Sequence, residues 1–159
     1  MVSDQNRHRI DAAKQLMDAG DSAGASRRLT ELVEKKVPEA LFLASTFSAS
    51  SSESDEQFER RSLEMLRESA NLGYLPAMYA LANCYEVGDL VEQDSAAAML
   101  WYKRASEGGD DRAKFRYGLA LLSGVGGTQD ALLGTKLINE AADAGVEGAS
   151  EALEDELRK

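Results

Sequence analysis

The chain has 159 residues and a formal charge of −10, from 18 Lys and Arg against 28 Asp and Glu. This length suits one compact domain or one short repeat array. The acidic surface argues against a general nucleic-acid role, because it repels phosphate backbones.

The negative charge is concentrated in the second half of the chain. Residues 1–80 carry 10 basic and 13 acidic side chains, whereas residues 81–159 carry 8 and 15. A basic partner would therefore be steered toward the C-terminal half.

Membrane, metal and disulfide chemistry are not expected. No apolar run approaches the ~20 residues needed to span a bilayer, and the N-terminus lacks the apolar core of a signal peptide. His8 is the single histidine and Cys84 the single cysteine, so neither a zinc site nor an internal disulfide has enough members. We expect a cytoplasmic monomer or weak dimer without metal or cofactor.

The predicted elements begin with a helix pair. Apolar residues at helical spacing between Ile10 and Met17 predict a helix over residues 5–19, and a second apolar stripe predicts its mate over 22–36. We take 5–36 as the first helix-turn-helix unit.

A second pair follows. The stretch Pro38–Phe47 mirrors Pro76–Tyr85 at an offset of 38 residues, and it predicts a helix over 39–48. A serine-rich loop separates this helix from its mate over 55–72, which completes the unit 38–72.

The third pair has the clearest pattern. Ala77, Leu81 and Tyr85 lie on one side of a helix predicted over 76–87. Gly88 can adopt the left-handed conformation that ends such a helix.

Its mate is predicted over 94–107. Asp94 is placed to cap the N-terminus, an interaction that contributes about 1 kcal/mol. Trp101 and Tyr102 form the apolar face, and Gly109 allows the next turn.

The same pattern recurs 36 residues later and predicts helices over 110–122 and 130–144. The two copies make units 76–108 and 112–145, and an amphipathic helix over 148–157 caps the array. The repeated structural positions of the second copy are Ala113, Gly124, Asp130 and Gly145.

These residues resemble the Sel-one-like repeat, a relative of the tetratricopeptide repeat. The motif reads Ala77-x3-Leu81-Ala82-x2-Tyr85-x2-Gly88-x2-Val91-x2-Asp94-x3-Ala98-x2-Trp101-Tyr102-x2-Ala105. Its spacing of 36 is that family's, rather than the 34 of the tetratricopeptide repeat. The second copy departs from the motif at Leu137 and Ile138, where the family usually has Trp and Tyr.

The resemblance implies an all-α fold, a right-handed α/α superhelical solenoid that mediates protein–protein contacts. We expect about four helix-turn-helix repeats plus the C-terminal capping helix, in a single domain over 1–159. The resemblance brings no catalytic residues, because the residues that the family shares are structural.

The concave face is the candidate binding surface. First helices line this face in such a superhelix, and aromatic side chains there are favoured binding anchors. Leu119 and Leu122 are expected to be exposed and to hint at a contact patch. The candidate residues are Phe42, Tyr79, Asn83, Glu86, Phe115, Leu119 and Leu122.

Packing between repeats is the competing interpretation. It applies with about equal weight to the three aromatics, Phe42, Tyr79 and Phe115. For Trp101 and Tyr102 it is the favoured one, so that Trp101→Ala would cost about 3–5 kcal/mol.

Three functions compete. The first is a scaffold or adaptor whose groove holds a partner protein. The second is a dedicated inhibitor or immunity protein that neutralises a basic toxin or effector, motivated by the small size and the charge of −10. An enzyme is disfavoured, because no nucleophile, base and orienting group converge.

Overall fold

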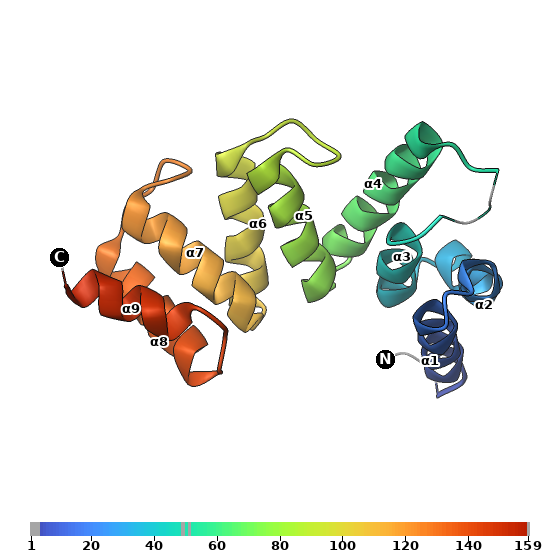
Figure 1. Ribbon diagram of the computed structural model, residues 1–159, viewed down its shortest axis with the longest axis horizontal. Helices are drawn as coiled ribbons and strands as arrows, with labels where there is room; N and C mark the ends of the chain where they lie inside the picture. The colour runs from blue at the N-terminus through green and yellow to red at the C-terminus, as the bar shows by residue number, and fades with distance from the viewer. Residues whose placement is uncertain (1–3, 49, 51, 159) are drawn as a thin grey trace. The chain divides into compact units, whose positions relative to one another are not determined.

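The computed structural model describes residues 4–48, 50 and 52–158, and these residues form nine α-helices and no strand (Figure 1). The predicted all-α class is confirmed. The helices are α1 (Asp4–Asp18), α2 (Ser22–Glu34), α3 (Pro38–Ser45), α4 (Asp55–Asn71), α5 (Leu75–Val87), α6 (Ser95–Glu107), α7 (Asp111–Ser123), α8 (Ala131–Asp143) and α9 (Ala149–Leu157).

The chain divides into two compact units, Met1–Ala77 and Met78–Lys159. The expectation of one continuous repeat domain stays a prediction. Positions 49 and 51 of the predicted serine-rich loop lie outside the described residues.

The one helix that ends well before its predicted boundary is α3, which stops at Ser45 rather than at residue 48. The Ser45 hydroxyl donates to the Phe42 carbonyl at 2.7 Å, and the Thr46 hydroxyl donates to the Leu43 carbonyl at 2.7 Å. Side chains that bond to nearby carbonyls offer the backbone an alternative to another helical turn.

In the first unit, buried serines of α4 form hydrogen bonds with backbone carbonyls of α3. The Ser69 hydroxyl donates to the Pro38 carbonyl at 2.7 Å, and the Ser62 hydroxyl donates to the Ser45 carbonyl. Both serines are buried, so these bonds satisfy hydroxyl groups that would otherwise be costly to desolvate.

Arg61 of α4 donates hydrogen bonds to backbone carbonyls at the C-terminal end of α3. Its guanidinium donates to the carbonyls of Ala44 and Phe47, each at 2.8 Å, and to the Glu53 carboxylate at 2.6 Å. The Ala44 carbonyl lies in the last turn of α3 and the Phe47 carbonyl lies just after it, so neither has a partner within the helix. Sequence analysis did not single out Arg61.

The 36-residue period is visible in the packing. Ala77, Ala113 and Ala149 are each fully buried near the start of a first helix. Asp94 caps α6 by accepting from the amides of Ala96 and Ala97, and Asp130 caps α8 by accepting from that of Leu133.

Glycines end the helices of this period. Gly88 has φ +78°, and Gly124 has φ +72° at the end of α7. Gly109 and Gly145, which follow the second helices, also have positive φ values of +97° and +78°. An L side chain rarely adopts this conformation, which accounts for glycine at the turns.

A pair of glutamines repeats a capping contact that the sequence did not suggest. The Gln93 amide donates to the Glu86 carbonyl at 2.8 Å, and the Gln129 amide donates to the Leu122 carbonyl at 3.1 Å. Both the donors and the acceptors are 36 residues apart, so each copy satisfies the same terminal carbonyl of its first helix.

Candidate functional site

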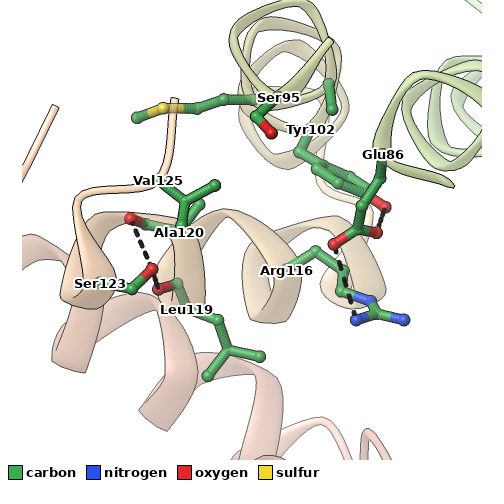
Figure 2. A pocket seen from close by; sticks show the side chains of 10 residues that line it. Glu86, Ser95, Tyr102, Arg116, Leu119, Ala120, Ser123 and Val125 are labelled. Atoms are coloured by element: carbon green, nitrogen blue, oxygen red, sulfur yellow. Dashed lines mark hydrogen bonds and ion pairs between the residues drawn. The ribbon is translucent and has the colours of Figure 1, made fainter. Parts of the chain in front are cut away.

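A pocket of about 130 Å³ in the second unit is lined by the end of α5, by α6 and α7, and by the loop after α7 (Figure 2). We call it the α6–α7 pocket. Its lining residues are Glu86, Ser95, Ala98, Met99, Tyr102, Arg116, Leu119, Ala120, Ser123 and Val125.

One side of the pocket is apolar. Met99 comes from α6, Leu119 and Ala120 come from α7, and Val125 of the following loop is 51% exposed. The loop can approach α6 because Gly126 lacks a side chain: a β-carbon there would lie 2.9 Å from the Met99 sulfur. The glycine-rich turn thus positions Val125 at the pocket.

The other side is polar and centres on Tyr102. The Tyr102 hydroxyl lies 2.6 Å from Glu86 Oε2 and within hydrogen-bonding distance of the Asn83 side chain. A hydroxyl has one proton to donate, and a carboxylate can only accept, so Glu86 takes the proton. Asn83 Oδ1 is a second acceptor beside the same Tyr102 hydroxyl.

Burial sets the protonation state of Tyr102. The side chain is 3% exposed, and this desolvation raises the pKa of Tyr102 above that of an exposed tyrosine; the hydrogen bond to Glu86 and the charge of Glu86 raise it further. Tyr102 is therefore a stable donor that fixes the orientation of the Glu86 carboxylate.

Arg116 of α7 completes the polar side (Figure 2). Its Nη1 lies 4.0 Å from Glu86 Oε1, and both side chains are more than 40% exposed. An ion pair that is long and exposed contributes little to stability. Glu86 and Arg116 can therefore each leave this pair to bind a charged group of another molecule, at little cost in free energy.

Beside the pocket, Tyr79 of α5 contacts both neighbouring helices. Its ring centroid lies 5.7 Å from that of Tyr102, and the Arg112 guanidinium lies over its face at 4.5 Å. Arg112 is held by Asp110 at 2.9 Å. The structure thus brings the predicted residues Tyr79, Asn83 and Glu86 to one place, where each contacts a neighbouring side chain.

The predicted exposure of Leu119 and Leu122 is wrong, and their role in binding stays a prediction. Leu119 and Leu122 are half-buried rather than exposed, and together with Phe115 they pack on the core formed by Ile138 and its neighbours in α8 and α9. The capping helix α9 covers the face that a helical projection of α7 alone leaves open. Of this group, Leu119 also reaches the α6–α7 pocket.

The three predicted aromatics share one kind of contact. Phe42 meets Tyr74, just before α5, with ring centroids 5.5 Å apart. Tyr79 meets Arg112 in the first turn of α7, and Phe115 lies beside Gly148, just before α9. Each aromatic therefore packs against the start of the next first helix, which favours the interpretation as packing between repeats. Their role in binding stays a prediction.

Trp101 and Tyr102 differ although they are neighbours in the motif. Tyr102 is buried, whereas Trp101 is half-buried, with the Arg104 guanidinium over its ring at 4.4 Å. The long arginine side chain covers part of the indole that the sequence placed between repeats.

Sequence analysis missed most of the pocket. Met99, Arg116, Ala120, Ser123 and Val125 belong to no part of the repeat motif. The glycine-rich stretch after α7 carried the one usable signal, because consecutive glycines permit a loop to approach a neighbouring helix closely.

Comparison with known proteins identifies the repeat. Residues 75–110 and 111–146 each match the Sel1 repeat. A Sel1 repeat protein from Oxalobacter formigenes superposes with a TM-score of 0.73 at 27% identity, over 80% of this chain and 95% of that one.

Two further solved structures show the same fold. The protein c5321, a protective antigen of uropathogenic Escherichia coli strains with an SLR fold, gives a TM-score of 0.70 at 24% identity, over 82% of this chain and 28% of that chain. Helicobacter pylori cysteine rich protein B gives 0.63 at 19% identity, over 84% and 95%.

The structural likenesses confirm the predicted helical-repeat solenoid class. Sel1 repeats generally mediate protein–protein interaction and do not typically form enzymes. Residues 75–146, which span the third and fourth predicted units, thus match the Sel1 repeat family.

Proposed function

We propose that this chain is an adaptor that binds a partner protein at the α6–α7 pocket. The observation that supports the proposal is the pocket itself, in which an apolar wall that includes the exposed Val125 faces the polar side of Glu86 and Arg116. Protein-binding surfaces commonly combine a small apolar centre with polar groups at its edge.

The pocket is better suited to binding than the predicted aromatic positions are. Tyr79 is engaged by Tyr102 and Arg112, and Phe115 packs on the α8–α9 core. Substitution of either residue would disturb packing between helices, and a loss of binding would then be hard to separate from a loss of stability.

The test fills the pocket without touching that packing. Ala120 is half-buried and lines the pocket, so Ala120→Arg places a long side chain in it. Ala144→Arg is the matched control, because Ala144 is exposed at the end of α8. Proteins that co-purify with the tagged chain should be lost with Ala120→Arg and retained with Ala144→Arg.

Circular dichroism melts of both variants verify that they fold. A partner that is retained equally by the two folded variants would refute binding at this pocket.

A binding role rather than a catalytic one is supported by the side chains present. Cys84 is buried, and its burial raises the pKa of the thiol, which disfavours the reactive thiolate. Among the described residues, no three His, Cys, Asp or Glu side chains come together as a metal site.

No described helix is long and apolar enough to cross a bilayer.

A second candidate is an inhibitor that covers a basic toxin or effector. The observation in its favour is a run of exposed carboxylates from the end of α8 through α9, namely Asp143, Glu147, Glu151, Glu154 and Asp155. Such a surface would bind by charge, and its affinity would fall steeply with salt. Binding to a basic toxin that is unchanged by salt, or by Glu147→Lys with Glu151→Lys, would exclude binding through this acidic surface.

A further inference from the structure

We infer that the segment bound in the α6–α7 pocket carries an aliphatic side chain next to a Lys or Arg, with the aliphatic group in the pocket and the cation on an acidic rim. The acidic rim consists of Glu86, Asp89 and Glu92. This inference rests on the proposed function and specifies the chemistry of its partner.

The apolar wall sets the first half of this chemistry. A pocket of about 130 Å³ has room for a single side chain rather than for a helix face. Met99 contributes a flexible thioether that adapts to branched or unbranched chains. An aliphatic side chain suits this wall, because Ala98, Met99 and Ala120 present apolar groups without a polar partner to satisfy.

The loop that carries Asp89 and Glu92 begins and ends at the pocket. This loop joins Glu86 to Ser95, and both of these residues line the pocket. It is fastened close to the end of α5, because the Asp94 amide donates to the Tyr85 carbonyl at 2.9 Å and the Gln93 side chain donates to the Glu86 carbonyl.

The charges of the rim are available to a partner. Asp89 and Glu92 are exposed, and neither forms an ion pair with any described residue. The sequence contains no Lys or Arg between Arg67 and Lys103, and the ion pair that the described residues give the rim is the long contact between Glu86 and Arg116. The deficit of positive charge in residues 81–159 adds a long-range attraction for a basic segment.

Glu86 is oriented to accept the cation. Tyr102 donates to its Oε2 at 2.6 Å, which leaves Oε1 facing Arg116 at 4.0 Å, beyond hydrogen-bonding distance. A Lys or Arg from the partner can therefore bond to Oε1 without breaking the Tyr102 contact. Arg116 favours an acidic partner instead, and the experiment separates the two possibilities.

The experiment selects binders from a displayed random peptide library on the full-length chain, with the Ala120→Arg variant used to remove peptides that bind elsewhere. Selected peptides are synthesised, and their affinities are measured by fluorescence anisotropy. We expect an aliphatic residue beside Lys or Arg in the selected sequences, and loss of binding with Ala120→Arg.

A charge reversal tests the rim directly. Asp89→Lys with Glu92→Lys should weaken these peptides about tenfold, because two attractive contacts become repulsive. Asp143→Lys with Glu147→Lys makes the same change in net charge at exposed positions that do not line the pocket. This control should retain most of the affinity.

The outcomes distinguish the two proposals. Peptides that depend on Ala120 but are rich in Asp or Glu, or that tolerate the rim reversal, would overturn the acidic-rim inference and leave the binding pocket intact. Peptides that bind Ala120→Arg equally well, or no selectable peptide, would count against the pocket itself. Self-association of the chain that Ala120→Arg abolishes would identify a second copy as the occupant and would also overturn the inference.

Discussion

Gly118 of α7 and Gly134 of α8 face each other so closely that neither position has room for a β-carbon. A β-carbon on Gly118 would lie 2.9 Å from the Gly134 carbonyl oxygen, and one on Gly134 would lie 2.8 Å from the Gly118 carbonyl oxygen. The positions 36 residues earlier are Ala82 and Ala98, both buried. The fourth unit thus has glycines where the third has alanines, and its helix backbones come into direct contact.

Gly118→Ala should therefore destabilise the protein, by about 2 kcal/mol, since overpacking a tight contact costs about 1–3 kcal/mol and outweighs the gain in helix propensity. Urea unfolding measures the change. Ala82→Gly is the reciprocal variant, and it should also destabilise, because each unit is packed for its own residue. A Gly118→Ala protein more stable than wild type would show that helix propensity dominates and that the contact can relax.

Trp101→Ala should cost less than its place in the motif suggests. The indole is half-buried and is partly covered by Arg104, so we expect a loss of about 2 kcal/mol rather than the 3–5 kcal/mol of a fully buried tryptophan. Tyr102→Ala should cost more, because Tyr102 is 3% exposed. Thermal melts of the two variants give the order, and a larger loss for Trp101→Ala would contradict it.

Tyr102→Phe should make the protein less stable at neutral pH, by about 1 kcal/mol, because it removes the donor to Glu86. The folded protein raises the pKa of Tyr102, chiefly by burial, so the stabilisation is fully present below the ordinary tyrosine pKa of about 10 and is lost as pH rises through the higher folded value. The stability gap between wild type and Tyr102→Phe should therefore narrow above about pH 10. Unfolding free energies across this range test the sign; a gap that widened would be inconsistent with a raised pKa.

Gln93→Ala and Gln129→Ala should have matching effects, because the two side chains make the same contact 36 residues apart. Each loses one hydrogen bond to a terminal carbonyl, and we expect about 0.5–1 kcal/mol per variant. Gln15→Ala is the control on an exposed helical glutamine. Urea unfolding that showed no more loss for Gln93→Ala or Gln129→Ala than for this control would assign the contacts no energetic role.

Arg61→Lys should destabilise the first unit although it keeps the charge. A lysine cannot reach the carbonyls of Ala44 and Phe47 and the Glu53 carboxylate at the same time, and we expect a loss of about 2 kcal/mol. Its exposed neighbour provides the control, since Arg60→Lys should stay within about 0.5 kcal/mol. Equal urea midpoints for the two variants would rule out a special role for the Arg61 guanidinium.

Helix positions were predictable because local chemistry sets them. Apolar spacing, the capping residues Asp94 and Asp130, and the glycines at the turns act within a few residues of one another, and most observed boundaries lie within two residues of those predicted. The exception is α3, which ends early. The Ser45 and Thr46 hydroxyls bond to carbonyls of α3, and the spacing of apolar residues does not predict whether such bonds form in place of another helical turn.

The candidate site was only partly predictable. The repeat offset grouped Tyr79, Asn83 and Glu86 correctly, since residues one helical turn apart share a face. Arg116 and Val125 come from a different helix and from a loop, and their approach to α6 depends on packing that no local pattern encodes.

The sequence by itself therefore determined the period, the helices and the turns of this repeat protein, because these follow from hydrogen bonds and backbone preferences over short distances. Tertiary structure alone decided which faces are covered. Leu122 is half-buried because α8 packs against it, and Trp101 stays only half-buried although the repeat motif predicts packing between repeats. The exposure of a side chain depends on which side chains a neighbouring helix places opposite it. The α6–α7 pocket likewise depends on how α7 and the loop after it pack against α6, which brings Val125 near Met99.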